Sequence, residues 1–387
     1  MKNFLVNPIN DKKLDNLVAV IRKMYLENLS VLNFKNHIDS QLNFNPSINC
    51  FVGDNGSGKT NLLDAIHYLS FTKSFFVKQD AYNVTYDYPF MSVEGIFNTE
   101  LGEDKIQCAV KIGEKKVVRK NKKPYSKLAD HIGRYPLVMV SPTDTELLVG
   151  GSDFRRRYMD SVISQFDKNY LESLIQYNKL IGQRNALLKS PSMNQLSLGV
   201  YDEQIHPIAQ IIYQKRNRFL NQLLPIFLKY YNDISSTQEN VNIDYTSQLS
   251  DFDYLSLTQK AYQKDKHLQY STVGIHKDDL VFQLNNHLVR RSGSQGQQKT
   301  YLLALKLAQF DFMKESLGFK PMLLLDDIFD KLDDNRVEHL MALVHDLHFG
   351  QIFVTDTHPQ RSKDIFNKIN ADYKLFHIKN GKVEKEE

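Results

Sequence analysis

One eight-residue string has the residue types and spacing of a phosphate-binding loop, G-x-x-x-x-G-K-T. Glycines in such a loop let backbone N–H groups curl around phosphate oxygens, and the N-terminus of the following helix adds partial positive charge. At this spacing Lys59 reaches the β- and γ-phosphates of ATP, and the Thr60 hydroxyl binds Mg²⁺. The predicted cofactor-binding residues, called the phosphate loop below, are Gly53, Asp54, Asn55, Gly56, Ser57, Gly58, Lys59 and Thr60.

Two carboxylates, Asp326 and Asp327, directly follow the apolar run 322–325, which is typical of a buried strand. A P-loop ATPase needs such a strand opposite its lysine, with one carboxylate for Mg²⁺ and a second to orient the attacking water. We assign Asp326 to the metal and Asp327 to water activation. The alternative is a strand that ends in a polar turn without a catalytic role.

The residues on either side of the phosphate loop predict how it is positioned. An apolar run that predicts a strand precedes it: Ile48, Cys50, Phe51 and Val52. A pattern at helical spacing follows it: Leu62, Leu63, Ile66 and Leu69. Strand, glycine-rich turn and helix start together are the context that makes the motif specific, although an accidental match of a glycine-rich turn is the alternative.

The order of patterns along the chain predicts an α/β protein interrupted by a helical insertion. Residues 24–152 are strand-rich and form the first part of an ATPase domain, called the head. Residues 153–270 form a mainly helical arm with a turn within 189–199, and residues 271–387 return to the head. Residues 1–23 differ in pattern, and our hypothesis is that they are a dispensable extension or follow an upstream start codon.

Elements of the second half are predicted with uneven clarity. Residues 235–248 give no clear signal. The predicted strands cover 280–284, 288–290, 322–325, 351–355 and 373–378, and the predicted helices cover 297–317, 336–347 and 363–368. This alternation places Asp326 and Asp327 in the same mixed sheet as the strand before the phosphate loop.

Composition restricts the class of protein. The 387 residues are 42% hydrophobic and 24% charged, which suits a globular protein of two domains or one domain with a large insertion. No apolar run approaches the roughly 20 residues of a membrane-spanning helix, and the N-terminus lacks a signal-peptide core, so we expect a cytoplasmic protein. Cys50 and Cys108 lie in separate apolar segments and predict neither a disulfide nor a zinc site.

Two groups of basic residues are candidates for contact with DNA, although the net charge of +4 does not demand it. The first group lies between residues 111 and 127 and consists of Lys115, Lys116, Arg119, Lys120, Lys122 and Lys123. The second consists of Arg155, Arg156 and Arg157 at the base of the arm. Lys and Arg release counterions when they contact nucleic acid phosphates. The alternative for the first group is a solvated hairpin. The alternative for the second group is structural ion pairs.

The string Ser294-Gln295-Gly296-Gln297-Gln298, called the signature turn below, resembles the S-G-G-Q signature of ABC-type ATPases. The resemblance implies that Ser294 and Gly296 contact the γ-phosphate bound by a second subunit, so that ATP is sandwiched in a head-to-tail dimer. Residues 330–333 resemble the D-loop that crosses the same interface. His358 falls near the position of the switch histidine, although a capping or surface histidine is the alternative.

Within this class the chain resembles the RecF family from residue 24 onward, and the strings that carry the resemblance are 25–36, 53–61, 141–160, 274–280, 294–300 and 323–333. Departures are the 23-residue extension, Ile275, Lys277 and the string FDKLD. The resemblance implies a weak DNA-stimulated ATPase, because Asp327 stands where most ABC ATPases have a longer glutamate. It also implies an ATP-dependent homodimer that binds single-strand/double-strand DNA junctions, with RecR, RecO and RecA as partners and no membrane.

Other classes fit less well. A transporter subunit has a much shorter interval between its phosphate loop and its signature than that between Thr60 and Ser294. A GTPase would show N-K-x-D, but Asn178-Lys179 is followed by Leu180-Ile181. The arm is too short for the coiled coil of an SMC protein. A nucleotide switch or scaffold that does not bind DNA stays open, and turnover that is insensitive to Asp327→Asn would favour it.

Overall fold

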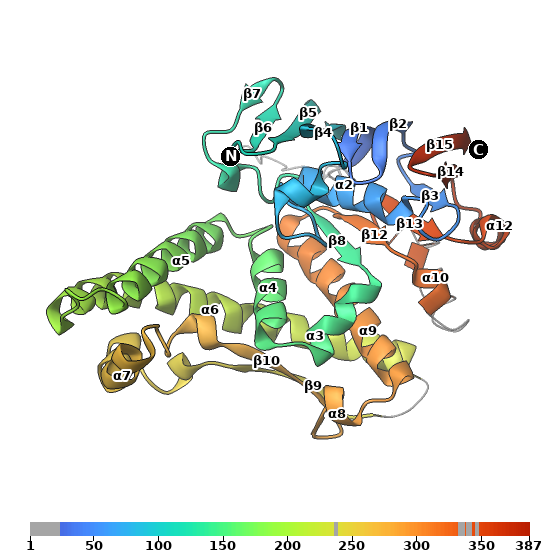
Figure 1. Cartoon of the computed structure of the whole chain (residues 1–387). Coiled ribbons are helices and arrows are strands. Elements are labelled where there is room, and N and C mark those ends of the chain that lie inside the picture. Colours follow the sequence, from blue (N-terminus) through green and yellow to red (C-terminus); the bar gives the residue numbers. More distant parts are fainter. Residues whose placement is uncertain (1–23, 236–238, 332–336, 338–342, 345–347) are drawn as a thin grey trace, which may run out of the picture.

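The structure is a computed structural model that describes residues 24–235, 239–331, 337, 343–344 and 348–387. Figure 1 shows a head with two stacked sheets in the upper part and an arm of helices below it. The α/β class and the interruption of the head by a mainly helical arm are confirmed. The predicted helix 336–347 lies mostly outside the described residues, although Val337, Leu343 and Val344 are helical.

The central sheet of the head carries the strands on either side of the predicted site. Its strand order is β15-β14-β3-β13-β12-β8, and every pair except β14–β15 is parallel. The strands are β3 (Ile48–Val52), β8 (Leu137–Val140), β12 (Met322–Leu325), β13 (Ile352–Asp356), β14 (Tyr373–Lys379) and β15 (Lys382–Glu386). Because neighbouring parallel strands end at the same edge, the ends of β3, β13 and β12 bring residues from distant parts of the chain together.

Burial of both faces explains the continuous apolar runs of these strands. Successive residues point to opposite faces, so Met322 and Leu324 belong to one hydrophobic cluster, while Leu323 and Leu325 belong to another. The first cluster includes α2 (Lys59–Phe71), and the second includes α9 (Gln295–Leu317). The sheet is therefore sandwiched between the helix that follows the phosphate loop and the helix that begins at the signature turn.

A second, antiparallel sheet covers α2, with strand order β2-β1-β4-β5-β6-β7. Its strands are β1 (Tyr25–Phe34), β2 (His37–Asn43), β4 (Phe90–Thr99), β5 (Gly102–Lys111), β6 (Val117–Lys120) and β7 (Lys123–Pro124). The head is completed by short helices: α3 (Thr145–Val149), α10 (Ile328–Lys331), α12 (Pro359–Lys368), and the 3₁₀ turns η1 (Asp80–Asn83), η2 (Leu128–Asp130) and η3 (Pro142–Asp144).

The arm combines helices with a small sheet, and the predicted strand 280–284 is confirmed as part of that sheet. Its helices are α4 (Ser152–Ile163), α5 (Lys168–Leu188), α6 (Gln195–Ile234) and α7 (Tyr254–Leu268). Its three-stranded sheet has the order β11-β10-β9, from β9 (Val241–Thr246), β10 (Asp279–Leu284) and β11 (His287–Leu288), with the turns η4 (Gln248–Ser250) and η5 (Ile275–Lys277) beside it. Within the described residues, no helix is both long and apolar enough to cross a membrane.

Two predictions about this region are corrected, and a stretch that gave no signal is assigned. The stretch 235–248, which gave no signal, contains β9. The predicted strand 288–290 is mostly wrong, because β11 ends at Leu288 and the short helix α8 (Val289–Ser292) follows. The predicted domain boundary after residue 270 separates strands that pair, since β10 hydrogen-bonds to β9 along its whole length.

Candidate nucleotide-binding site

The phosphate loop connects the end of β3 to the start of α2, and backbone geometry explains two of its glycines. Gly58 is the N-cap residue of α2 with φ 117°, and Gly53 has φ 153°. Both values lie in the region that side chains disfavour. A Cβ at Gly53 would lie 2.2 Å from the Ile378 carbonyl oxygen, so β14 closes that side of the loop. Glycine is therefore required at these positions by the fold as well as by a ligand.

Lys59 lies inside the loop and is only 5% exposed. Its Nζ donates hydrogen bonds to the carbonyl oxygens of Gly53 at 2.7 Å and Asp54 at 3.0 Å. Ser57 Oγ is buried in the same loop and has no hydrogen-bond partner among the described residues. The Lys59 ammonium is buried, and the buried Ser57 hydroxyl has no partner in the described part of the chain. Both fit a site that is completed by phosphate oxygens.

Asp326 meets Thr60 at the edge of the central sheet, although 266 residues separate them. Thr60 Oγ1 donates to Asp326 Oδ1 at 2.8 Å, and Thr355 Oγ1 donates to the same oxygen at 3.0 Å. Burial raises the pKa of Asp326, and the neighbouring Asp327 raises it further. The described residues include no cluster of three or more His, Cys, Asp or Glu side chains that could hold a metal alone. One carboxylate and one hydroxyl beside a phosphate site fit Mg²⁺, which keeps waters and phosphates as its other ligands.

Asp327 follows in a left-handed backbone conformation, with φ 46°. Its N–H donates to Thr355 Oγ1 at 2.8 Å, and the same hydroxyl contacts Asp327 Oδ1 at 3.4 Å. Thr355 in β13 therefore holds both carboxylates. Sequence reasoning missed Thr355, because a threonine inside a predicted strand carries no signal until its neighbouring strand is known.

Two hairpins enclose the phosphate loop, and neither was predicted to do so. In the turn between β1 and β2, Asn36 Nδ2 donates to the Ser57 carbonyl at 3.2 Å, and His37 Nε2 donates to the Gly58 carbonyl at 3.0 Å. Burial lowers the pKa of His37, so its neutral ring makes this bond at neutral pH. These contacts fix the Ser57 and Gly58 carbonyl groups of the loop.

The second hairpin is that of β14 and β15. The Gly381 N–H donates to the Ser57 carbonyl at 2.8 Å. A Cβ at Gly381 would lie 1.9 Å from the Asn36 carbonyl oxygen, so the two hairpins touch beneath the loop. The first and last hairpins of the described chain thus meet at the phosphate loop.

The signature turn forms the N-terminus of α9 and faces solvent. Ser294 is the N-cap residue and forms a capping box, in which its Oγ accepts from the Gln297 N–H at 3.2 Å and Gln297 Oε1 accepts from the Ser294 N–H at 2.7 Å. Gln297 Nε2 also donates to Glu239 Oε1 at 2.6 Å, and Tyr231 of α6 donates to the other oxygen of Glu239. Figure 1 places this end of α9 beside α8 at the lower edge of the molecule, whereas β3 and α2 lie in the upper part.

A single chain shows less about the other residues that were predicted at the dimer interface. The carbonyl of Gly296 accepts from Thr300 Oγ1 at 3.1 Å. His358 is exposed and is the N-cap residue of α12, where its N–H donates to Asp356 Oδ1 at 3.1 Å. The predicted D-loop, 330–333, begins in the last residues of α10, and residues 332–333 lie outside the described residues. The chain therefore brings together Lys59, Thr60, Asp326 and Asp327, but not Ser294.

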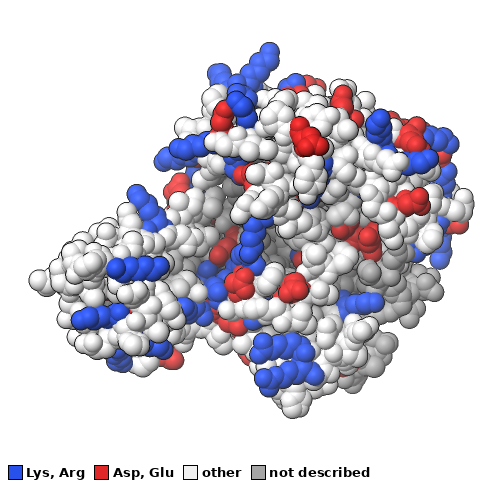
Figure 2. All heavy atoms as spheres, viewed as in Figure 1, with Lys and Arg blue, Asp and Glu red and all other residues white. Residues whose placement is uncertain are grey.

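The basic run is a partly neutralised surface of the β5–β7 region. Lys116 pairs with Asp80 at 2.9 Å, and Lys120 pairs with Asp104 at 2.6 Å. Arg119 Nη1 donates to Gln107 at 3.0 Å. Three exposed cations have no partner among the described residues: Lys115, Lys122 and Lys123. Figure 2 shows basic side chains projecting at the top of the molecule, over β6 and β7.

The three arginines at the base of the arm separate into two roles. Arg155 is 6% exposed and binds Asp279 through two bonds of 2.6 and 3.0 Å. Arg156 Nη1 donates to the Asp278 carbonyl at 2.7 Å. Arg155 thus forms a structural ion pair, and Arg156 is bonded to a backbone carbonyl. Arg157 is 48% exposed and has only Asp153, one turn away, as its ion-pair partner at 2.9 Å.

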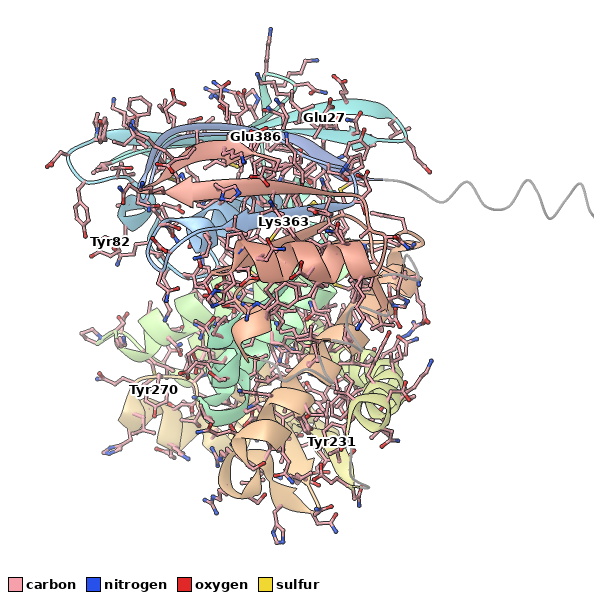
Figure 3. The ribbon with its side chains drawn as sticks, turned by 90° about the vertical axis from the view of Figure 1, so that its right-hand side faces the viewer. Glu27, Tyr82, Tyr231, Tyr270, Lys363 and Glu386 are labelled. Atoms are coloured by element: carbon pink, nitrogen blue, oxygen red, sulfur yellow. The ribbon has the colours of Figure 1, made fainter. Side chains whose placement is uncertain are left out.

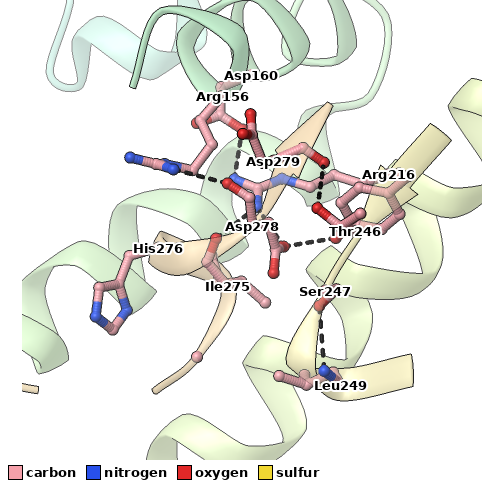
Figure 4. A network of polar contacts seen from close by, with 12 residues as sticks. Arg156, Asp160, Arg216, Thr246, Ser247, Leu249, Ile275, His276, Asp278 and Asp279 are labelled. Atoms are coloured by element: carbon pink, nitrogen blue, oxygen red, sulfur yellow. Dashed lines mark hydrogen bonds and ion pairs between the residues drawn. The ribbon is translucent and has the colours of Figure 1, made fainter. Parts of the chain in front are cut away.

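A buried arginine that the sequence did not reveal explains the string 274–280. Arg216 of α6 binds Asp278 Oδ2 at 2.7 Å, Asp160 Oδ1 at 2.9 Å and the Ile275 carbonyl at 2.8 Å (Figure 4). Arg216 is 1% exposed, and the network joins α4, α6 and η5. Removing one partner of a buried ion pair leaves an uncompensated charge, which makes these aspartates structural requirements of the arm.

The fold and the site define the class first. A phosphate loop and a strand-terminal carboxylate on one edge of a mixed sheet, with a signature-like turn on the helix behind that sheet, are the parts of an ABC-type ATPase head. An Smc head domain from Pyrococcus furiosus shares this fold, with a TM-score of 0.55 and 17% identity over 94% of this chain and 96% of that chain.

The family follows from closer relatives. The family described as "RecF/RecN/SMC N terminal domain" matches residues 25–125. The "DNA replication and repair protein RecF" of Phocaeicola vulgatus is 47% identical over 363 residues, which are 93% of this chain and 98% of that protein. The protein of the same name from Flavobacterium johnsoniae is 45% identical over 359 residues, 92% of this chain and 100% of that protein. The chain belongs to the RecF family.

A solved structure supports the same assignment. It is titled "Structure of the recombination mediator protein RecF-ATP in RecFOR pathway". It superposes with a TM-score of 0.86 and 30% identity, over 95% of this chain and 99% of that one. The resemblance inferred from short strings thus extends over nearly the whole fold.

Proposed function

We propose that this protein is an ATP-dependent DNA-binding protein of recombinational gap repair and replication restart, acting in the cytoplasm. The observation that carries the proposal is the meeting of Lys59, Thr60 and Asp326 in a head that matches an ATP-bound RecF structure. The names of its relatives, which describe DNA replication and repair, give the biological setting.

The nucleotide half of the mechanism uses residues that are already in place. Lys59 and N–H groups of the loop would bind the phosphates, and Thr60 with Asp326 would hold Mg²⁺, which would neutralise phosphate charge. Asp327 orients the attacking water. Because its side chain is one carbon shorter than glutamate, we expect slow hydrolysis, with ATP acting mainly as a clamp.

The second half comes from another copy of the chain. Ser294 is exposed at a helix N-terminus, where its hydroxyl and the helix dipole suit a phosphate. Two chains arranged head to tail would place each signature turn on the other chain's ATP. ATP would then hold the dimer together, and hydrolysis would release it.

DNA and proteins are the proposed partners of that dimer. Single-strand/double-strand junctions are the proposed DNA, and RecR and RecO are the proposed partners in loading RecA at gaps. The remaining candidates for phosphate contact are Lys115, Lys122, Lys123 and Arg157, because the other basic residues have internal partners.

DNA binding to gapped, duplex and single-stranded substrates, with and without ATP and at several salt concentrations, tests the proposal. We expect tighter binding with ATP and a preference for the gapped substrate. The variant Lys115→Ala/Lys122→Ala/Lys123→Ala should lower the slope of log K against log salt by up to about three, since each phosphate contact contributes about one. The matched variant Lys260→Ala/Lys264→Ala/Lys266→Ala removes three exposed lysines of the arm helix α7.

A second candidate is a nucleotide switch or scaffold that does not bind DNA. The pairing of Lys116, Lys120 and Arg155 with carboxylates favours it, because these cations are not free to contact DNA. Failure to bind any of the three DNA substrates, with ATP binding intact, would select this candidate. Turnover that falls in Asp327→Asn would then distinguish an active switch from a scaffold.

A further inference from the structure

A short segment of the head exposes an unusual number of aromatic rings. They are Tyr82, Tyr86, Tyr88 and Phe90, with 71%, 93%, 37% and 40% of their surface exposed, and are called the aromatic strip below. Two other strongly exposed aromatics occur in the described residues, and a lysine covers each of them. Lys260 lies 4.0 Å from the Phe252 ring centre, and Lys277 lies 5.2 Å from that of Tyr270. Exposed apolar surface that is concentrated in one place marks an interaction site.

The backbone that carries the strip is fixed to the head. Asn83 and Val84, between the first two rings, are buried. The Asn83 carbonyl accepts from the Lys35 N–H at 2.7 Å, and the Thr85 N–H donates to the Asn33 carbonyl at 2.9 Å. The rings are therefore held outward by a rigid base, and Figure 3 shows Tyr82 projecting away from the body of the molecule.

One basic residue precedes the strip in the chain, and an ion pair joins another to η1, which carries Tyr82. The ion pair of Lys116 with Asp80, the first residue of η1, fixes the β5–β6 turn against the segment that carries Tyr82. Lys115 in that turn and Lys78 just before η1 are exposed and have no ion-pair partner in the described part of the chain. One exposed carboxylate, Asp87, lies within the strip. The surroundings thus favour an anionic ligand over a cationic one.

We propose that the aromatic strip is a base-stacking platform for single-stranded DNA, with Lys78 and Lys115 contacting the phosphates. Rings on a fixed base beside lysines are what a single strand requires, because its bases are free to stack while its backbone needs cations. Tyrosine suits this role, since its ring stacks and its hydroxyl stays in water. The inference rests on the proposed function, and it assigns the aromatic strip to the single-stranded part of a gapped substrate.

The test uses the full-length protein with ATP and three DNA probes: a (dT) oligonucleotide, an abasic strand of the same length, and a duplex. Tyr82→Ala/Tyr86→Ala should bind the (dT) strand at least about tenfold more weakly, because stacking on each ring contributes to affinity. Binding to the abasic strand and to the duplex should not change. The matched control Phe252→Ala/Tyr270→Ala, which removes the two lysine-covered aromatics, should behave as the unaltered protein.

A spectroscopic variant tests stacking directly. The protein contains no tryptophan, so Tyr86→Trp creates a single reporter on the strip. Its fluorescence should be quenched by the (dT) strand and not by the abasic strand. Equal affinity of the double alanine variant and the unaltered protein for (dT), or a reporter that does not respond, would overturn the proposal even when duplex or gapped DNA binds normally. Absence of all DNA binding by the unaltered protein would refute the proposed function as well.

Discussion

The phosphate loop and the signature turn lie at opposite ends of the same ATPase head and differ in how much of their own chain surrounds them. Hairpins from both ends of the described chain enclose the phosphate loop, and Thr60 already contacts Asp326. The signature turn is exposed, and a capping box and one bond to Glu239 hold its Gln297. This difference suits the proposed arrangement, in which a nucleotide held by the phosphate loop joins two copies of the chain.

The largest effect is expected from a substitution in the phosphate loop. Lys59→Met should lower ATP affinity at least about a hundredfold, because the bonds of the ammonium to phosphate are charge-assisted. ATP-dependent dimerisation should disappear with it. Equilibrium binding of a fluorescent ATP analogue and sedimentation would measure the two effects. Dimers that form at unchanged ATP concentrations would contradict the role of the phosphate loop.

The second largest effect distinguishes the signature turn from the phosphate loop. Ser294→Arg should leave ATP binding by the single chain unchanged, because Ser294 caps the end of α9 that lies beside α8 at the lower edge of the molecule, whereas β3 and α2 lie in the upper part (Figure 1). Dimerisation should weaken at least about thirtyfold, the loss typical of a central contact residue. Sedimentation at saturating ATP would measure it, with Ser192→Arg, in the turn before α6, as a control of the same chemistry. Normal dimerisation would refute the trans arrangement.

A moderate effect is expected from the histidine beneath the loop. His37→Gln should weaken ATP binding by about 1 kcal/mol, the contribution of one buried hydrogen bond, while dimerisation at saturating ATP persists. His267→Gln, which alters an exposed histidine of α7, is the control for this titration. Unchanged ATP affinity would show that the hairpin does not shape the loop.

The same histidine predicts a pH dependence of stability. Burial lowers the pKa of His37, and lowers those of His67 and His131 to about 4. The unfolded chain therefore binds more protons than the folded one below pH about 6.5, so acidification through that range should decrease the free energy of unfolding. In His37→Gln this decrease should be shallower by up to about 1.4 kcal/mol per pH unit, as denaturant titrations would show. An equal slope in both proteins would contradict a neutral, buried His37.

The smallest effect is expected from a substitution in the signature turn. Gln297→Ala removes the reciprocal bond of the capping box and the bond to Glu239, so the helix N-terminus should lose about 1 kcal/mol. Dimerisation should weaken several-fold without any change in ATP affinity. Gln214→Ala, on the exposed side of α6, is the control. A change in ATP affinity would mean that the two ends are coupled within one chain.

The sequence predicted the parts of the site that local patterns encode. Glycine spacing, an apolar strand before the loop and paired carboxylates after another strand are short-range signals, and parallel pairing then brings Thr60 and Asp326 together. The enclosing residues could not be predicted in this way. His37 and Gly381 are bonded to the loop from distant positions, and each is ordinary in its own turn.

The arm was harder to predict for two physical reasons. Strand β9 alternates apolar and polar residues over only six positions, which is too short a signal without its partner β10. The roles of the arginines depend on burial: Arg155 and Arg157 are two residues apart on α4, but only Arg155 faces Asp279. Charge in a sequence does not show which cations the fold neutralises.

Helix α6 has a mechanical consequence for the signature turn. It runs 40 residues from the tip of the arm to a bond between Tyr231 and Glu239, which also holds Gln297. At 1.5 Å per residue α6 is roughly 60 Å long. A tilt of the helix by about 5° about its signature end would therefore displace the end at the arm tip by on the order of 5 Å. A partner bound at the arm tip would therefore act, through α6, on the contacts that hold Gln297 beside the proposed signature residue Ser294.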